Sequence, residues 1–175
     1  MPVANILVMG VHAAPRLDGF SYRGECEYSL TLCTASRRHW FVDEPTVERA
    51  RTPLLKHASE YEFEVTAYCF MPDHVHALVT ATSTESDLQK FVSRWKQASG
   101  YAHKAATHLR LWQGGFYDHV LRQDEDRSKV IRYLLDNPIR AGLVSTLREY
   151  PYWGSGVCSR DELIEVLFDR AGFTP

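Results

Sequence analysis

The pattern of hydrophobic and polar positions along this 175-residue chain changes its period several times, and each change predicts a new element. The predicted strands cover 27–33, 62–70 and 74–80, the predicted helices cover 46–60 and 85–105, and 111–122 is irregular or a strand. A turn at Pro72-Asp73 joins the second and third strands into a hairpin. The second helix has apolar residues at helical spacing, namely Leu88, Phe91, Val92, Trp95 and Ala102.

A further helix is predicted over 124–138. Asp124 is a good N-cap residue, and Glu125 and Asp126 place negative charge in the first turn, where the helix dipole favours it. Pro138 is expected to end this helix. Its apolar stripe consists of Val130, Ile131, Leu134 and Leu135, which gives the helix one face to bury.

Strands with helices between them, together with a hairpin, indicate an α+β sandwich. The chain has the length of one domain and can bury a sizeable core. A last helix begins with a capping box formed by Ser159 and Glu162 and is expected to end near Gly172. We expect an irregular lead-in over 1–20, one domain over 21–156 and a C-terminal helix extension over 157–175.

The composition is that of an ordinary globular protein. The 4 cysteines have no CxxC and no paired spacing, which argues against a zinc knuckle or a disulfide framework and favours reduced thiols in a cytoplasm. The apolar run at the start of the chain lacks a basic n-region and is too short to span a bilayer. A cytoplasmic protein is therefore the expectation.

The formal net charge is −2, although many nucleic-acid-binding domains are strongly basic. Basic residues are nevertheless clustered at Arg37-Arg38-His39, Arg94 with Lys96, His103-Lys104, and His108 with Arg110. Each cluster alone is as typical of a solvated surface as of a contact with phosphate. Together they favour a localised groove and a modest, salt-sensitive affinity for nucleic acid.

The most informative stretch of the chain is His74-Val75-His76, inside a predicted strand. Strand side chains alternate between faces, so the two imidazoles point the same way. Imidazole is the commonest ligand of divalent metals, and the pair is therefore a candidate metal site. Alone, this pattern is also typical of a structural or surface pair. A metal enzyme would need a third ligand and a nucleophile elsewhere in the chain.

Tyr133 and Asn137 are candidates for those two roles. Tyr133 lies at the edge of the apolar stripe of its predicted helix, and Asn137 follows four residues later on the same side. One helix can therefore present a phenol and a carboxamide together to whatever faces it. Without the His pair, the same residues would indicate a packing tyrosine and an ordinary helix end before a proline.

Taken together, these features resemble the REP-associated tyrosine transposases, a branch of the single-tyrosine HUH transposase superfamily. Five segments in the family's order carry the resemblance, and they cover 28–38, 70–76, 111–122, 132–144 and 150–155. The resemblance implies an HUH-endonuclease fold, in which a central antiparallel sheet carries the His pair and packs with helices as a ferredoxin-like or RRM-like sandwich. It also implies that the tyrosine helix packs close to that sheet.

The activity that the resemblance implies is that of a transposase, which cleaves single-stranded DNA near a hairpin in a repetitive extragenic palindrome and rejoins it. Tyr133 would attack a phosphodiester and give a 5′-phosphotyrosine intermediate. His74, His76 and Asn137 would hold Mg²⁺ or Mn²⁺, although imidazole by itself also suits zinc. The implied partner is single-stranded or hairpin DNA, with no membrane and no small-molecule cofactor. The protein would act as a monomer or a dimer.

Several further residues are candidates for DNA contact. They are Arg37, Arg38, Arg132 and Arg140 for phosphate groups and Trp112 for stacking on unpaired bases. Trp95 fits a core position better because it belongs to the apolar stripe of its helix.

Other interpretations of the sequence stay open. Tyr117 is a second candidate nucleophile, but it lacks a metal-ligand partner at helical spacing. Asp73 fits a turn better than a ligand position, and His119 is either a nearby acid or base or a structural histidine. The chain is alternatively a catalytically silent protein that binds hairpins in DNA or RNA. A third possibility is a metal nuclease that uses water and leaves no covalent adduct.

Overall fold

The computed structural model describes residues 21–168, so the lead-in predicted over 1–20 and the helix end predicted near Gly172 lie outside the described residues. The first six regular elements are β1 (Glu27–Cys33), α1 (Glu44–Glu60), β2 (Phe63–Met71), β3 (His74–Ala81), α2 (Leu88–Thr107) and β4 (Tyr117–Val120). They are followed by α3 (Arg127–Leu135), α4 (Asn137–Arg140), β5 (Trp153–Gly154) and α5 (Arg160–Phe168). Two 3-10 turns, η1 (Ala35–Arg37) and η2 (Leu147–Glu149), complete the order.

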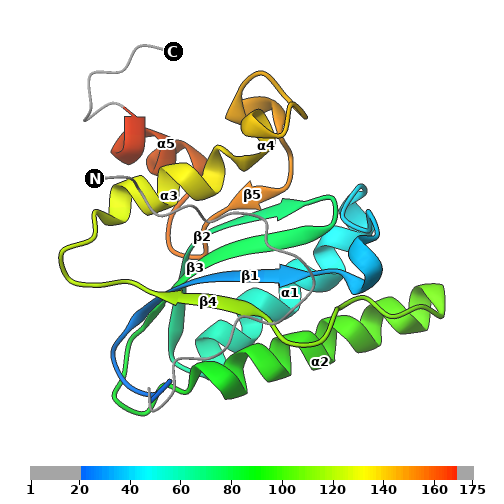
Figure 1. The fold of residues 1–175 in the computed structure, drawn as a ribbon, viewed down its shortest axis with the longest axis horizontal. Helices are drawn as coiled ribbons and strands as arrows, with labels where there is room; N and C mark the ends of the chain where they lie inside the picture. Colours follow the sequence, from blue (N-terminus) through cyan, green and yellow to red (C-terminus); the bar gives the residue numbers. More distant parts are fainter. Residues whose placement is uncertain (1–20, 169–175) are drawn as a thin grey trace.

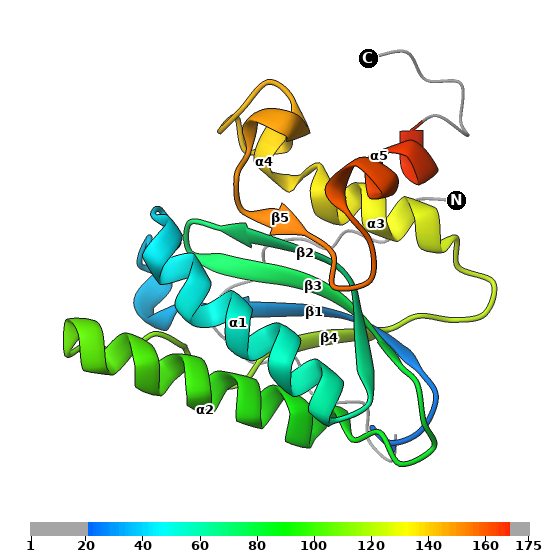
Figure 2. The same ribbon diagram turned by 180° about the vertical axis from the view of Figure 1, so that it is seen from behind.

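The strands form one antiparallel sheet in the order β4-β1-β3-β2-β5 (Figure 1). Helices α1 and α2 connect β1 to β2 and β3 to β4, which is the split βαβ arrangement of ferredoxin-like folds. Both helices cover the same face of the sheet (Figure 2). The predicted α+β fold with a central antiparallel sheet is confirmed.

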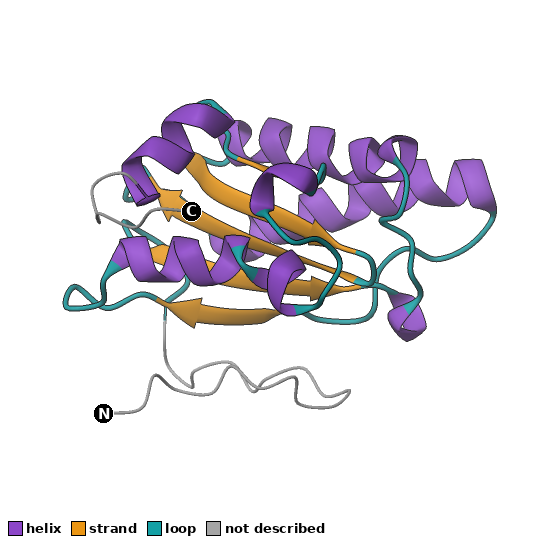
Figure 3. Cartoon of the chain, turned by 90° about the horizontal axis from the view of Figure 1, so that it is seen from above, coloured by secondary structure: helices purple, strands orange, loops and turns teal. Residues whose placement is uncertain are grey.

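The sheet lies between two helical layers (Figure 3). Alternation along β3 directs Val75, Ala77 and Val79 into the core beneath α1 and α2. Leu78, on the opposite face, packs in a second core with residues of α3 and α5. His74 and His76 alternate in step with Leu78, so the His pair lies on the face of the sheet that carries α3.

Helix α3 packs on this second face through Ile131, Leu134 and Leu135, three of the four residues of the predicted stripe. The fourth, Val130, is partly buried against the same cluster. At the start of the helix, Arg127 pairs with Glu27 of β1 at 2.8 Å and thereby fastens α3 to the sheet.

The predicted boundaries of the tyrosine helix were wrong at both ends. Asp126, rather than Asp124, caps α3, because its carboxylate accepts a hydrogen bond of 3.0 Å from the amide of Ser128. Pro138 does not end α3, which already stops at Leu135. The proline instead lies in the first turn of α4, where a helix does not need the missing N–H group.

Other core assignments were confirmed or corrected by burial. Trp95 is fully buried, as predicted, and its indole donates a hydrogen bond of 2.9 Å to the carbonyl of Ala50. His103, which the sequence grouped with the exposed basic clusters, is fully buried as well. All four cysteines are free thiols. None of the helices within 21–168 is long and apolar enough to cross a membrane.

Candidate active site

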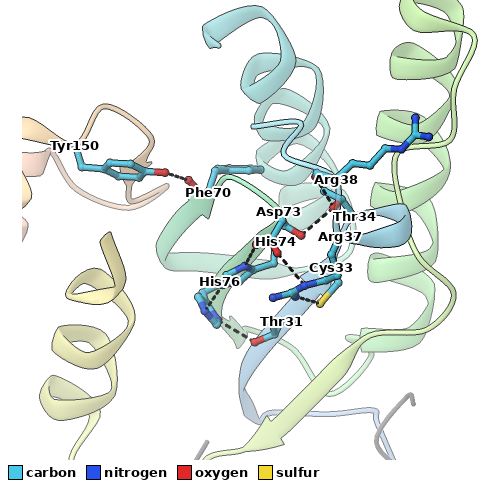
Figure 4. A network of polar contacts seen from close by, with 10 residues as sticks. All are labelled: Thr31, Cys33, Thr34, Arg37, Arg38, Phe70, Asp73, His74, His76 and Tyr150. Carbon is cyan, nitrogen blue, oxygen red and sulfur yellow. Dashed lines mark hydrogen bonds and ion pairs between the residues drawn. The ribbon is translucent and has the colours of Figure 1, made fainter. Parts of the chain in front are cut away.

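The two imidazoles of the His pair meet edge to face. Their ring centroids are 4.7 Å apart at an interplanar angle of 87°, and the two Nε2 atoms lie 3.0 Å from each other. Figure 4 shows both rings projecting from β3 and converging at their tips. The strand alternation that placed these residues on one face also makes their nitrogen atoms adjacent.

The outer nitrogen of each imidazole is held by a neighbouring residue. Asp73, in the β2–β3 turn, accepts a hydrogen bond of 2.6 Å from Nδ1 of His74. Thr31 lies opposite His76 in the β1–β3 register, and its Oγ1 is 2.9 Å from Nδ1 of His76. Such contacts fix the ring orientation and direct the Nε2 atom of each imidazole toward the other ring.

The donor set fits a divalent cation. Metal–ligand bonds of about 2.1 Å at right angles separate two ligand atoms by about 3.0 Å. The Nε2 atoms of His74 and His76 have this separation. Within residues 21–168, no third histidine, cysteine or acidic side chain joins the pair to form a metal cluster. A third protein ligand would therefore have to be an amide or another neutral oxygen donor.

The surroundings of His76 favour its neutral form. Burial and the neighbouring His74 lower the pKa of His76 to about 3. Arg140 and Arg37 act in the same direction, because both positive charges lie within electrostatic range of the ring. Metal binding requires a neutral imidazole, so His76 meets that requirement at neutral pH.

Asp73 connects the pair to a wider polar network (Figure 4). Burial alone would raise the pKa of Asp73, but its hydrogen bond to His74 and the nearby charge of Arg37 hold the pKa below its usual value. Arg37 pairs with the carboxylate at 2.8 Å and also donates to Sγ of Cys33 at 2.8 Å. The carboxylate is therefore ionised and held on two sides.

Tyr133 is 37% exposed, so its phenol is accessible to a macromolecular substrate. Nη2 of Arg140 donates a hydrogen bond of 3.0 Å to the phenol oxygen. The guanidinium carbon of Arg140 also lies 4.0 Å from the centroid of the tyrosine ring. Because Arg140 is also within electrostatic range of His76, this arginine links the tyrosine helix to the His pair.

Asn137 is the first residue of α4, and its amide nitrogen caps the end of α3. Nδ2 donates to the carbonyls of Tyr133 at 3.1 Å and Leu134 at 3.0 Å. These contacts use the amide nitrogen and leave the amide oxygen, which is the atom that a metal would bind, outside them. In the described part of the chain, no hydrogen bond joins Asn137 or Tyr133 directly to the two imidazoles.

The sequence and the fold have known counterparts. The family model "Transposase IS200 like" matches residues 22–137. The chain belongs to this family. A REP-associated tyrosine transposase of Escherichia coli (strain K12) is 26% identical over 102 residues, which cover 58% of this chain and 60% of that protein. The predicted resemblance to REP-associated tyrosine transposases is thus confirmed, although the chain aligns with less than two thirds of that relative's length.

A solved structure supports the fold of this chain. The structure of a REP-associated tyrosine transposase bound to a REP hairpin superposes with a TM-score of 0.65 and 20% sequence identity. The alignment covers 83% of this chain and 82% of that chain. At this identity the likeness concerns the fold, and the roles of individual residues have to be argued from their own contacts.

Two of the residues predicted to contact DNA are placed elsewhere. Trp112 is 4% exposed, its indole donates to Oγ of Ser99 at 2.8 Å, and its ring packs against Phe41 and Trp95. Its ring therefore lies in the core and is not exposed for stacking on bases. Arg132 donates to the carbonyl of Leu167, so its guanidinium is engaged in holding α5.

The remaining candidate residues lie close to the His pair or on the protein surface. Arg37 supports Asp73, as described above, and Arg38 is exposed in the turn that follows η1. Tyr117 is paired with Thr31 across β1 and β4, so it shares the face of the sheet that carries the His pair. His119 is exposed and lies 2.9 Å from the carboxylate of Glu125.

The roles of Asp73 and Thr31 as supports of the imidazoles were not predicted from the sequence. A signal for Asp73 was present, because a carboxylate directly before His74 at the end of a turn can reach its Nδ1. No such signal existed for Thr31. Its contact depends on the strand register, which pairs residues 45 positions apart.

Proposed function

We propose that this IS200-like transposase cleaves and rejoins single-stranded DNA by transesterification, with Tyr133 as the nucleophile. The observation that carries the proposal is the pair of Nε2 atoms 3.0 Å apart, each on a ring whose other nitrogen is already held. This pair would bind the cation, and Arg140, which donates to the phenol oxygen of the exposed Tyr133, lies within electrostatic range of His76. A phosphodiester repels nucleophiles with its negative oxygens, so a site for its cleavage needs positive charge next to the attacking group.

His74, His76 and Asn137 would hold the divalent cation, Mg²⁺ or Mn²⁺. When bound, the cation would neutralise charge on a non-bridging phosphate oxygen. The chain's own residues supply the other functions. Asp73 and Thr31 keep the imidazoles oriented, and Arg140 holds the phenol oxygen of Tyr133 in place.

The covalent step is a balanced exchange of ester bonds. The phenol oxygen of Tyr133 forms a bond to phosphorus while the bond from phosphorus to the 3′-oxygen breaks. The phenol proton is released, and the 3′-oxygen departs and takes up a proton. The products are a 5′-phosphotyrosine and a free 3′-hydroxyl. Since one phosphodiester replaces another, a 3′-hydroxyl can reverse the step and rejoin the strand.

The proposed substrate is hairpin DNA with single-stranded flanks. Its support comes from the relatives, because the Escherichia coli protein is named a REP-associated transposase and the similar solved structure contains a REP hairpin. The face of the sheet that carries the His pair offers room for such a strand, since Thr31 and Tyr117 of β1 and β4 are only partly buried there.

The test uses one hairpin oligonucleotide labelled either at its 3′ end or at its 5′ end, incubated with Mn²⁺ and resolved on a denaturing protein gel. We expect a labelled protein band with the 3′ label alone. The band should be absent after chelation and in the Tyr133→Phe and His76→Ala variants. Cleavage without a labelled band would instead indicate a hydrolytic nuclease. Neither cleavage nor adduct across a panel of hairpins would indicate a silent binding protein.

A further inference from the structure

A groove lined by basic residues runs beside the loop that follows α2. Two adjoining cavities of about 600 and 620 Å³ share Arg110, Gln113 and Gly114 as common walls. One cavity extends along the C-terminal half of α2, and the other extends to the η1 turn. We refer to the two together as the loop groove.

Every titratable side chain that lines the loop groove is basic. These side chains are Arg37, Arg38, Lys96, Lys104, His108 and Arg110. The chain as a whole carries a formal net charge of −2, so this clustering is a local departure from the overall balance. A concave surface of one charge sign concentrates ligands of the opposite sign. The chemistry of the groove therefore points to a polyanion.

Three of these cations lack a compensating carboxylate. Within the described range 21–168, neither Arg38, Lys104 nor Arg110 has an acidic partner. Several basic residues elsewhere on the surface are paired with a carboxylate, as Arg127 is with Glu27 at 2.8 Å. Lys96, in the same groove, has a pKa lowered to about 8. Burial is the larger cause, and repulsion by the nearby positive charge of Arg110 adds to it.

The groove is held open by its own walls. The indole of Trp112 donates to Oγ of Ser99 at 2.8 Å, and Nζ of Lys96 donates to the carbonyl of Gln113 at 2.9 Å. The amide of Gln113 donates to the carbonyl of Cys33 at 3.0 Å, which ties the loop to the end of β1. Because these contacts are made within the chain itself, they hold the loop in place, and binding need not order it first.

One end of the loop groove lies next to the candidate active site. Arg37 lines the groove and pairs with Asp73 at 2.8 Å, and Asp73 in turn holds His74 at 2.6 Å. A strand whose phosphate lies at the His pair can therefore continue past Arg37 into the groove.

We propose that the loop groove binds the phosphates of the single-stranded DNA segment adjoining the scissile position, through Arg38, Lys104 and Arg110. The assignment to this segment rests on the proposed function, because it follows from where the scissile phosphate would lie. The binding itself requires no cleavage. Trp112 contributes to the groove as a wall and not as a stacking platform, since its ring is buried.

The experiment measures binding in the Tyr133→Phe background, so that cleavage plays no part. Fluorescence anisotropy compares a hairpin that carries single-stranded tails on both sides with the same hairpin lacking tails, over a range of salt concentrations. Arg38→Ala combined with Arg110→Ala should weaken binding of the tailed hairpin. Its salt dependence should flatten by about 0.7 in log–log slope for each phosphate that the protein no longer neutralises. Binding of the tailless hairpin should not change.

Arg148→Ala combined with Lys56→Ala is the matched control, because both side chains are exposed cations outside the groove. An equal loss for tailed and tailless hairpins would overturn the single-strand assignment in favour of the stem. An unchanged affinity for both would overturn the groove as a DNA site. A tail-specific loss with no phosphotyrosine adduct in the wild-type protein would support the groove while rejecting the proposed catalysis.

Discussion

Arg140 donates a hydrogen bond of 3.0 Å to the phenol oxygen of Tyr133, seven residues earlier in the chain. The break between α3 and α4 at Asp136 lies between the two residues, yet the guanidinium still reaches across the tyrosine ring. A fixed positive charge therefore accompanies the proposed nucleophile before any substrate arrives. This charge favours the developing phenolate and the approach of a phosphate alike.

Arg140→Gln should slow the formation of the phosphotyrosine adduct by about ten- to a hundredfold, because a hydrogen bond to a charged group contributes about 1.5–3 kcal/mol. Arg140→Lys should restore part of the rate, since it keeps the charge but not the planar donor geometry. The rate is measured in a single turnover with protein in excess, which separates chemistry from DNA affinity. Arg148→Gln is the control, and a rate in Arg140→Gln equal to the control would contradict the assigned role.

The hydrogen bond between Asp73 and Nδ1 of His74 leads to a separate prediction about metal affinity. Asp73→Asn keeps the shape of the side chain but removes the charge that orients the imidazole. Removing such a partner typically costs about 10–100-fold in metal affinity. Titration of the DNA-free protein with Mn²⁺, followed by electron paramagnetic resonance, measures this directly. Asp161→Asn, an exposed carboxylate paired with Arg148, should bind Mn²⁺ like the wild type.

Asp73 also pairs with Arg37, so a weaker affinity in Asp73→Asn has two possible origins. Arg37→Gln separates them, because it leaves the contact between Asp73 and His74 in place. We expect Arg37→Gln to bind Mn²⁺ more tightly than Asp73→Asn. Equal weakening in both variants would show that the ion pair, and not the contact to His74, determines the affinity.

Strands β1, β2 and β3 could be predicted closely because their patterns are local, whereas the two-residue strand β5 has no such pattern and was not predicted. The predicted strand over 27–33 has the observed bounds of β1, and the predicted start of β3 at His74 is also confirmed. The first residue of α3 was harder to predict, since three consecutive acidic residues, Asp124, Glu125 and Asp126, could each act as the N-cap. Glu125 is engaged with the amide of Arg122 at 2.7 Å, whereas Asp126 accepts from the first amides of the helix.

The site was predictable only where its geometry follows from the spacing along one element. His74 and His76 converge because residues two apart on a strand share a face. The contact of Thr31 depends on how β1 pairs with β3, and the burial of Trp112 depends on a loop without regular periodicity. Neither can be derived from a one-dimensional pattern, because both arise from tertiary packing.

Tyr117 offers a direct test of the choice of nucleophile. It lies on the same face of the sheet as His76, separated from it by Thr31 of β1. The phenol oxygen of Tyr133 accepts a hydrogen bond from Arg140, whose guanidinium also lies over the tyrosine ring and within electrostatic range of His76. We therefore expect Tyr117→Phe to keep the phosphotyrosine adduct and Tyr133→Phe to lose it. An adduct that persists in Tyr133→Phe and disappears in Tyr117→Phe would reverse the assignment.

His103 is fully buried against Trp40, and neither of its ring nitrogens has a hydrogen-bond partner among residues 21–168. Burial lowers its pKa, and the charge of Arg49 adds to this effect, while Asp43 opposes it. The unfolded chain therefore takes up a proton below pH about 6.5 that the folded protein resists, and stability is lost as the pH falls below that value.

His103→Leu should remove this dependence on pH. Near pH 8, by the ordinary pKa of about 6.5, the histidine is neutral in both the folded and the unfolded chain, so the difference in free energy of unfolding between the two proteins should be constant there. Towards pH about 5 the difference should shift in favour of the variant, since only the wild type carries the titrating group. Urea unfolding at a series of pH values measures both curves. Parallel curves over this range would show that His103 is not the group responsible, because every other histidine is common to the two proteins.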